Sequence, residues 1–265
     1  MRTLSDKPGR VESKPELELI LLIVSSDPEA TVSKLKRLES IGPYKLLAEP
    51  ARLLHDIYLD TKDHALGKKR INLRIRGLGD SYWITMKTSP GLFSRRRHER
   101  QEVEIPWSSE SLRSIAGELA RKGVRLDLPE KLDETFSHLE LMKRIGLSIL
   151  QDRETERFPR NIIDSTVPSE ILGELEVDSV LYHFAGSDVR LFEIELEAKS
   201  ERGRDVLGKI SDKLLADFSS ELRTWRFGKL VTGEKIERML AQGSLTSLMK
   251  GDRLLPKAYP RIEHA

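Results

Sequence analysis

Two kinds of charged residue alternate with apolar residues in this sequence, and each kind keeps to its own segments. Acidic residues alternate in segments that hold Glu16 and Glu18, Glu174 to Asp178, and Glu193 to Glu197. Basic residues alternate in segments that hold Arg70 to Arg76, Thr85 to Lys87, and Arg153 to Arg157. Carboxylate oxygens are the ligands that Mg²⁺ and Mn²⁺ prefer, and the arginine guanidinium matches the geometry of phosphate. The residue types therefore favour a site where a divalent metal ion and a phosphate-bearing anion bind together.

A β-strand sends successive side chains to opposite faces, so this alternation predicts strands with one charged and one apolar face. Arg74 and Arg76 would share a face opposite Ile75, and Glu193 and Glu195 would share another. An antiparallel sheet with one solvated face would explain any single strand. Acidic and basic residues lie on different strands, and this separation favours a closed sheet with a charged lumen. A bound polyanion and a bound cation would compensate the charges of that lumen. We therefore expect an α+β fold, mainly antiparallel, with a closed barrel of roughly eight strands, a polar interior and helices packed outside.

Periodicity and turn residues place the elements that must position these side chains. Strands are expected near residues 16–24, 45–49, 55–60, 70–76, 82–87, 98–105, 148–157, 161–164, 170–182 and 189–199. Helices are expected near residues 27–41, with Asp27 as the cap, and near 110–123, 136–145, 203–217 and 233–242. Residues 77–80, Gly-Leu-Gly-Asp, predict a hairpin turn. We expect one domain over residues 15–243, a flexible arm over 1–14 and a poorly ordered tail over 244–265.

Composition excludes several classes of protein. The chain has 265 residues with 45 basic and 43 acidic side chains, so the net charge of +2 favours neither a nucleic-acid nor a membrane surface. The absence of cysteine excludes disulfides, thiol catalysis and cysteine-ligated metal sites. The sequence contains no phosphate-loop, His-Glu-x-x-His or dinucleotide fingerprint. It also lacks a long apolar run and an apolar N-terminal signal segment, so we expect a cytoplasmic protein.

Several segments carry a family resemblance through their order and spacing. They are Glu16-Leu17-Glu18-Leu19-Ile20, Asp56-Ile57-Tyr58-Leu59-Asp60-Thr61, Leu73-Arg74-Ile75-Arg76, Thr85-Met86-Lys87, Arg100-Gln101-Glu102-Val103-Glu104, Arg153-Glu154-Thr155-Glu156-Arg157, Asp178 and Glu193-Ile194-Glu195-Leu196-Glu197. Over roughly residues 15–230 the chain resembles the CYTH family, the triphosphate tunnel metalloenzymes. The 75–80 turn and the 85–87 segment are most similar to bacterial inorganic triphosphatases. The resemblance implies a tunnel of antiparallel strands that hydrolyses inorganic, nucleoside or thiamine triphosphate.

The resemblance also implies a role for each matching residue. Residues that would bind phosphate are Arg74, Arg76, Lys87, Arg100, Arg153 and Arg157. Residues that would bind Mg²⁺ or Mn²⁺ are Glu16, Glu18, Glu193 and Glu195. The implied catalytic residues, which would hold a second metal ion or orient water, are Glu102, Glu104 and Asp178. The implied partner is a triphosphate-bearing small molecule; we expect a monomer or homodimer that binds neither nucleic acid nor membrane.

One position departs from the family pattern and leaves alternatives open. Ile20 stands where the family usually has a lysine, and Arg223 or Arg226 could replace the lost charge. A non-catalytic module that binds polyphosphate or a nucleotide is therefore one alternative, and an adenylyl cyclase is another. His98 could act as an acid or base or make a hydrogen bond at the tunnel mouth. The basic loop at residues 95–97 could attract an anion or RNA, or form a solvated hairpin tip.

Overall fold

The computed structural model describes residues 17–88, 101–133 and 135–265. Its strands are β1 (Glu18–Ile23), β2 (Ser40–Ile41), β3 (Tyr44–Ala48), β4 (Arg52–Thr61), β5 (Ile71–Leu78), β6 (Ser81–Thr88), β7 (Gln101–Pro106), β8 (Leu147–Asp164), β9 (Val167–Phe184), β10 (Ser187–Ala198), β11 (Leu222–Trp225), β12 (Met249–Lys250) and β13 (Arg253–Leu254). Its helices are α1 (Pro28–Leu35), α2 (Ala65–Lys68), α3 (Ser109–Arg121), α4 (His138–Arg144), α5 (Glu201–Asp217), α6 (Lys229–Ala241), the 3-10 turn η1 (Thr246–Leu248) and α7 (Ala258–His264). The elements therefore follow the predicted order of a strand-rich fold with helices between the strands.

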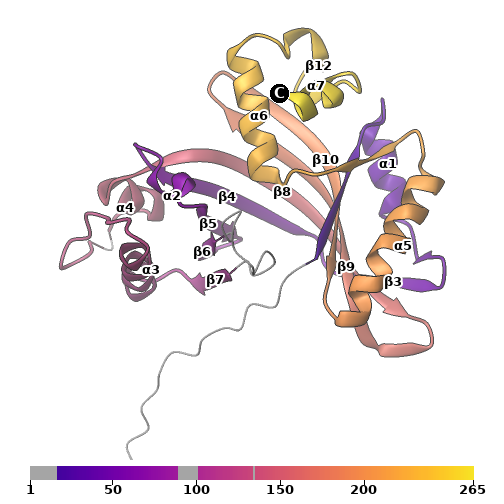
Figure 1. The fold of residues 1–265 in the computed structure, drawn as a ribbon, viewed down its shortest axis with the longest axis horizontal. Coiled ribbons are helices and arrows are strands. Elements are labelled where there is room, and N and C mark those ends of the chain that lie inside the picture. Colours follow the sequence, from indigo (N-terminus) through magenta and orange to yellow (C-terminus); the bar gives the residue numbers. More distant parts are fainter. Residues whose placement is uncertain (1–16, 89–100, 134) are drawn as a thin grey trace, which may run out of the picture.

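One strongly curved sheet organises these elements. Its hydrogen-bonded strand order is β11-β1-β10-β9-β8-β4-β5-β6-β7, with β2, β3, β12 and β13 attached beside it (Figure 1). The pairings along this order are antiparallel. The predicted α+β, mainly antiparallel architecture is confirmed, with nine strands in the order against the roughly eight expected.

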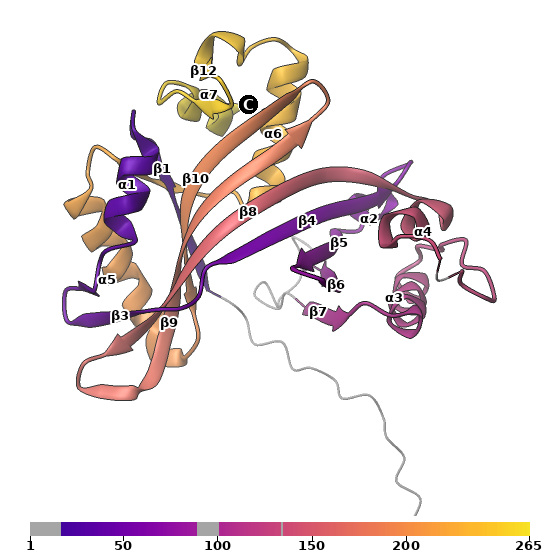
Figure 2. The same ribbon diagram turned by 180° about the vertical axis from the view of Figure 1, so that it is seen from behind.

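The outer face of the sheet is apolar and is covered by helices, as predicted. Leu21, Val177 and Ile194 of neighbouring strands pack with α1 and α5 in one core cluster. Ile75 and Ile84 of β5 and β6 pack with α3 and α4 in a second cluster. Figure 2 shows these two groups of helices at opposite ends of the curved sheet. Because the apolar side chains point outward beneath the helices, the alternating charged side chains must point inward.

The inner face changes from polar to apolar along the strands. On β9 the inward residues Glu176 and Asp178 are followed by Val180 and Tyr182, which belong to a third core cluster. That cluster also contains buried residues of the last part of the chain: Ile236, Met239, Leu245, Leu248, Leu254, Ala258, Tyr259 and Ile262. We call residues 229–264 the C-terminal cover. The expectation of a poorly ordered tail over residues 244–265 is wrong, because these apolar residues pack onto the inner face (Figure 2).

Strand β8 is longer than the sequence suggested. Residues 148–157 and 161–164 were expected as separate strands, but β8 runs without a break from Leu147 to Asp164. Pro159 does not interrupt β8, because it lies between the segment of β8 that pairs with β4 and the segment that pairs with β3. The β4 pairing ends at Arg157, and the β3 pairing begins at Arg160. A residue without an amide hydrogen is tolerated at such a gap in the ladder, and the Pro159 carbonyl still accepts a hydrogen bond from Glu49 N at 3.0 Å.

Helix boundaries differ from the predicted ones in two places that matter. Asp27 caps α1 as predicted, accepting from Ala30 N at 3.1 Å, but the helix ends at Leu35 rather than near residue 41. Helix α6 begins at Lys229, four residues before the expected start at 233. The earlier start brings a lysine to the first helical position, next to the polar part of the inner face. Within the described residues, none of the helices is long and apolar enough to span a membrane.

Candidate functional site

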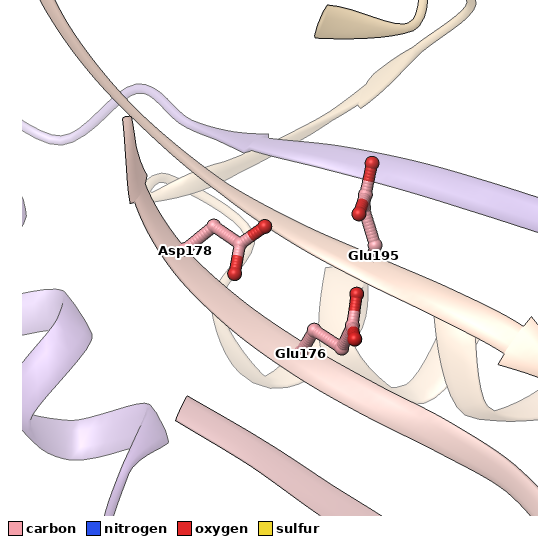
Figure 3. A group of neighbouring side chains, drawn as sticks. All are labelled: Glu176, Asp178 and Glu195. Carbon is pink, nitrogen blue, oxygen red and sulfur yellow. The ribbon is translucent and has the colours of Figure 1, made fainter. Parts of the chain in front are cut away.

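Five carboxyl groups from three strands gather on the polar part of the inner face. They belong to Glu18 of β1, Glu176 and Asp178 of β9, and Glu193 and Glu195 of β10, and we call them the acidic cluster. The antiparallel register sets Glu176 opposite Glu195 and Asp178 opposite Glu193. One carboxylate oxygen from each of Glu176, Asp178 and Glu195 lies within 4.8 Å of the others (Figure 3). Strand alternation and register therefore create an oxygen-rich site from residues that are far apart in the sequence.

Arg157 of β8 neutralises one side of the acidic cluster. Its Nη1 lies 2.5 Å from Glu176 Oε2, and its Nη2 lies 2.7 Å from Asp178 Oδ2 and 2.8 Å from Glu195 Oε2. A second contact, from Nε to Asp178 Oδ1 at 3.0 Å, makes the Arg157–Asp178 pair bidentate. A bidentate pair fixes both groups in orientation as well as in distance. The sequence assigned Arg157 to phosphate, but in this structure its donors are engaged by carboxylates.

Lys229, the first residue of α6, neutralises the other side. Its Nζ lies 2.9 Å from Asp178 Oδ2 and 2.6 Å from Glu195 Oε1, and it also pairs with Glu193. The side chain is only 6% exposed. Its backbone is held as well, because the Tyr182 hydroxyl donates to Lys229 O at 2.9 Å. The start of α6 is thereby tied to the sheet through both the side chain and the main chain of one residue.

Burial sets the protonation of the acidic cluster. It raises the pKa of Glu176 to about 8 and that of Glu193 to about 7. Burial acts in the same direction on Glu195, but the charges of Lys229 and the nearby arginine outweigh it and hold the pKa of Glu195 well below its usual range. Desolvation disfavours the charged form of a carboxyl group unless opposite charge is near. Burial therefore favours the neutral form of Glu176 and Glu193, whereas the charges of Lys229 and Arg157 favour the ionised form of Glu195.

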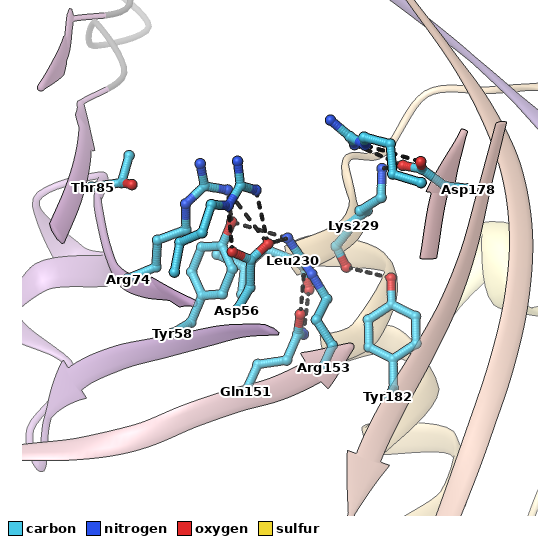
Figure 4. A network of polar contacts seen from close by, with 12 residues as sticks. Asp56, Tyr58, Arg74, Thr85, Gln151, Arg153, Asp178, Tyr182, Lys229 and Leu230 are labelled. Carbon is cyan, nitrogen blue, oxygen red and sulfur yellow. Dashed lines mark hydrogen bonds and ion pairs between the residues drawn. The ribbon is translucent and has the colours of Figure 1, made fainter. Parts of the chain in front are cut away.

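Three guanidinium groups form a second cluster around Asp56 and Tyr58 of β4. Arg76 Nε donates to Asp56 Oδ1 at 2.8 Å, and its Nη2 donates to Asp56 Oδ2 at 3.0 Å. Arg153 Nη2 donates to Asp56 Oδ2 at 3.3 Å and to the Tyr58 hydroxyl at 3.1 Å. Arg74 Nη1 donates to the Tyr58 hydroxyl at 3.3 Å and lies 3.6 Å from Asp56 Oδ2. We call these five residues the basic cluster (Figure 4).

The basic cluster carries more positive than negative charge. Burial acts to raise the pKa of Asp56, but the charges of Arg74, Arg153 and Arg76 outweigh it and hold the pKa well below its usual range. Asp56 is therefore ionised and is the one carboxylate within the cluster, against three guanidinium groups. Arg74 and Arg153 are 7% and 2% exposed, so water compensates little of this charge. An anion with several oxygens is the ligand that such a cluster fits.

Strands β6 and β7 add a mixed rim beside the basic cluster. Lys87 Nζ lies 2.9 Å from Glu102 Oε2, and Arg74 Nη2 lies 3.4 Å from Glu104 Oε2. The Thr85 hydroxyl donates to Glu104 Oε2 at 2.8 Å. The predicted catalytic residues Glu102 and Glu104 thus contact the basic side of the site. Among the described residues, no ion pair or hydrogen bond joins either of them to the acidic cluster.

The first turn of α6 links the two clusters. Gln151 of β8 donates from Nε2 to Leu230 O at 3.0 Å and accepts from Arg153 Nη1 at 3.0 Å (Figure 4). The preceding residue, Lys229, reaches the acidic cluster. Gly233 allows the close approach, because a Cβ there would lie 2.1 Å from Gln151 Nε2. Helix α6 therefore contacts the acidic side through a side chain and the basic side through a main-chain carbonyl.

The structure brings most of the predicted site residues onto one face. The described ones that share the inner face are Glu18, Arg74, Arg76, Lys87, Glu102, Glu104, Arg153, Arg157, Asp178, Glu193 and Glu195. Glu16, Arg100, His98 and residues 95–97 lie outside the described residues. Arg223 and Arg226 do not reach the clusters, because both contact Glu263 of α7. Neither arginine therefore replaces the charge that is missing at position 20.

Sequence reasoning did not assign five residues that the structure places in the two clusters or at their junction, namely Asp56, Tyr58, Gln151, Glu176 and Lys229. Asp56 and Glu176 had a signal, since both alternate with apolar neighbours in segments already recognised. Lys229 had none, because its helix was expected to begin later. The Lys229 ammonium supplies a positive charge to the acidic cluster, while Ile20 packs beside the apolar cluster under the C-terminal cover.

A comparison with protein families decides what kind of protein carries this site. The family model of the CYTH domain matches residues 30–224. This chain belongs to the CYTH domain family. A search of curated proteins gave no match. The family match covers every strand of the curved sheet from β2 to β10, and the C-terminal cover lies beyond it.

Three solved structures align with this CYTH-family chain over nearly the whole of their own length. One is a Hippeastrum protein described as a candidate adenylyl cyclase with a dominant triphosphatase activity, at 17% identity and a TM-score of 0.52, covering 84% of this chain and 96% of that one. Another is a Bacillus halodurans protein described as a candidate adenylate cyclase, at 19% identity and a TM-score of 0.46, covering 82% and 97%. A third is the PH1819 protein of Pyrococcus horikoshii, at 14% identity and a TM-score of 0.43, covering 86% and 99%. The first likeness supports the CYTH fold.

The acidic cluster fits a divalent metal ion by its donor set. All its ligating atoms are carboxylate oxygens, the donors that Mg²⁺ and Mn²⁺ favour. Glu193 is fully buried, and its Oε2 has no hydrogen-bond partner among the described residues. A buried carboxylate oxygen without a donor is costly, and a cation would satisfy it. The residues present are therefore suited to hold the metal ion that the family resemblance implies.

Proposed function

We propose that this protein hydrolyses a triphosphate on the inner face of its sheet, in a reaction that depends on Mg²⁺ or Mn²⁺. One observation carries the proposal: a cluster of three guanidinium groups, two of them buried, stands beside a cluster of five carboxyl groups, three of them buried, on one concave face. Neither cluster is neutral by itself. A metal–triphosphate complex offers oxygens to the first and a cation to the second.

The basic cluster is proposed to bind and orient the triphosphate. Arg74, Arg76 and Arg153 have donors fixed by Asp56 and Tyr58, so the guanidinium groups are held in place before substrate binds. Preorganised donors stabilise charge on phosphoryl oxygens without reorganising during the reaction. Lys87 is proposed to extend this surface at the rim, together with Arg100, which the sequence resemblance implies.

The acidic cluster is proposed to hold the metal. Glu18, Glu193 and Glu195 are the predicted ligands, and the structure adds Glu176 and Asp178 to the set of available oxygens. Glu16, one alternation before Glu18, completes the set implied by the sequence. A bound divalent ion would supply charge neutralisation of the phosphate and a lowered pKa for coordinated water. Asp178, Glu102 and Glu104 are proposed to orient the attacking water or hold further metal, as the resemblance implies.

Phosphate release tests the proposal directly. Inorganic triphosphate, ATP and thiamine triphosphate are each assayed with Mg²⁺, with Mn²⁺ and with a chelator, and cyclic AMP is measured from ATP in parallel. We expect turnover of at least one triphosphate that the chelator abolishes. Glu195→Gln should reduce it about tenfold to a hundredfold, the loss that is typical when the support of a metal site is removed. No turnover with any substrate and metal would reject hydrolysis, and cyclic AMP as the main product would identify a cyclase instead.

A matched control separates the acidic cluster from the rest of its strand. Glu197 lies two residues beyond Glu195 on the same face of β10, but its carboxylate pairs with Lys199 at 2.7 Å. Glu197→Gln should therefore retain activity within a few-fold of the wild-type protein. Equal losses of activity in Glu195→Gln and Glu197→Gln would mean that any negative charge on β10 has the same effect. That result would contradict the assignment of a metal site.

A further inference from the structure

The Lys229 ammonium lies among the most deeply buried carboxylates of the acidic cluster. It contacts oxygens of Asp178, Glu193 and Glu195, which come from two different strands. Asp178 and Glu193 have side chains with 0% exposure, so water does not compensate them. Among the described residues, Lys229 is the only ion-pair partner of Glu193. One lysine thus balances the most buried part of the acidic cluster.

Arg157 and Lys229 hold the acidic cluster in different ways. Arg157 is bidentate to Asp178 and is planar, so its position on β8 fixes the geometry of the pair. The Lys229 ammonium is a single point charge at the end of a flexible four-carbon stem. Of the two, lysine is the cation that can leave its carboxylates without distorting a strand. Its departure needs movement only of a side chain at the first position of α6.

We propose that Lys229 is an internal counter-cation of the acidic cluster and that a divalent metal ion binds there in exchange for it. The inference rests on the proposed function, because it concerns the same metal. Arg157 or Lys229 contacts every oxygen of Asp178 and Glu195, so a metal ion that binds both carboxylates takes a contact that one of these two cations now makes. Lys229 keeps the fold stable without metal and lowers the apparent affinity for metal alone.

The exchange makes metal and triphosphate bind cooperatively. An ammonium released inside a buried site needs a new anionic partner, because an unpaired buried charge is costly. Triphosphate supplies that anion, and the metal supplies the cation that replaces the ammonium. Each ligand therefore raises the affinity of the other, as linkage requires. Lys229 therefore acts on the reaction by setting the balance of charge in the site, in addition to any contact with the substrate.

Metal titration of Lys229→Met tests the exchange without relying on catalysis. Mg²⁺ or Mn²⁺ alone is titrated into the full-length protein by calorimetry, and thermal unfolding is recorded with and without metal. We expect the metal-free variant to unfold at a lower temperature than the wild-type protein. We expect metal to bind at least tenfold more tightly than in the wild type and to raise the unfolding temperature by a larger amount. Equal or weaker metal binding by Lys229→Met would overturn the proposal.

Two further comparisons test whether the effect is specific to Lys229 and provide a second variant in case Lys229→Met does not fold. Lys199→Met is the matched control, since Lys199 also bridges two carboxylates of β9 and β10, Glu174 at 3.2 Å and Glu197 at 2.7 Å, but outside the acidic cluster. It should leave metal affinity unchanged, and a similar gain there would overturn the proposal. If Lys229→Met does not fold, the double variant Lys229→Met/Glu193→Gln restores the charge balance. It must bind metal more tightly than Glu193→Gln alone, and failure to do so also overturns the exchange.

Failure of the exchange at Lys229 and failure of the proposed function give different experimental results. A wild-type protein that hydrolyses triphosphate with metal, while Lys229→Met gains no affinity, would refute the exchange and leave the function intact. Absence of divalent-metal binding in every variant, together with no hydrolysis, would refute the proposed function itself.

Discussion

The Arg76 guanidinium and the Asp56 carboxylate meet at two points on neighbouring strands, at 2.8 Å and 3.0 Å. The register of β4 and β5 sets these residues directly opposite each other. Asp56 therefore occupies, within the basic cluster, the kind of two-pronged contact that a phosphate would make with arginine. This internal anion stabilises three clustered guanidinium groups when no ligand is present, and it competes with a ligand for their donors.

Asp56→Asn should destabilise the ligand-free protein and strengthen its response to triphosphate. Removing one partner of a buried ion pair typically costs about 3 kcal/mol or more, because the remaining charges lose their compensation. Chemical denaturation measures this loss of unfolding free energy. Inorganic triphosphate should then raise the unfolding temperature of the variant by more than that of the wild type. Asp188→Asn is the control, since its half-exposed pair with His183 should contribute about 1 kcal/mol or less. A smaller ligand response in Asp56→Asn would contradict this account.

Arg153→Lys should weaken the proposed reaction although it keeps the charge. Arg153 donates to Gln151, Asp56 and Tyr58 at the same time, and an ammonium cannot reproduce this planar arrangement. Hydrogen bonds to charged groups contribute about 1.5–3 kcal/mol each, so kcat/KM should fall roughly tenfold to a hundredfold. Steady-state kinetics with the best triphosphate substrate measures the loss. Unchanged kcat/KM would show that only the charge of Arg153 matters.

Gly203→Ala should destabilise the fold, and Gly208→Ala on the same helix should not. Helix α5 lies so close to β9 that a Cβ at Gly203 would be 1.8 Å from Leu172 O, whereas a Cβ at Gly208 would meet nothing within 4 Å. Forcing a methyl group into packed backbone costs about 1–3 kcal/mol. Replacing an exposed helical glycine by alanine instead stabilises by roughly 0.5–1 kcal/mol. Urea denaturation of the two variants should give changes of opposite sign, and two changes of the same sign would contradict the packing described for α5.

The pair formed by His55 and Asp152 should make stability depend on pH. The hydrogen bond from the His55 ring to Asp152, at 2.7 Å, raises the pKa of His55. A raised pKa in the folded state gives stabilisation that is complete below about pH 6.5, the usual value, and is lost as the pH rises through the folded-state pKa. Both side chains are about a third or more exposed, so the effect should be about 1 kcal/mol or less.

Asp152→Asn isolates this effect. The variant should be less stable than the wild type at pH 5.5 and equally stable at pH 9, as measured by urea denaturation at each pH. A destabilisation that is the same at both values would mean that the pair acts through packing rather than through charge.

Alternation was enough to predict the outer and inner faces of the sheet, because a strand has only two sides and the apolar one must be covered. It placed Arg74, Arg76, Glu193 and Glu195 on the inner face correctly. It could not show that Arg157 would be engaged by three carboxylates, since that depends on how β8, β9 and β10 are aligned in space. Charge patterns along one strand do not determine which sign lies on the neighbouring strand.

Helix boundaries and the role of the last residues were harder to predict. Lys229 follows Gly228, a weak start signal without a capping side chain, so the first turn of α6 was not expected to be helical. Residues 244–265 contain several turns and short elements, and their apolar residues have no long period. Their burial depends on an apolar patch supplied by distant strands, including Val180 and Leu191. Tertiary packing of this kind leaves little trace in local sequence.

The adjoining positions of Lys229 and Leu230 have a mechanical consequence. The side chain of the first is anchored among carboxylates, and the carbonyl of the second is anchored, through Gln151, to a guanidinium. Any tilt or slide of this short stretch must strain or relax both anchorages together. The opening turn of α6 is therefore attached to both charged clusters at once, so that a shift of this turn would change the contacts of both.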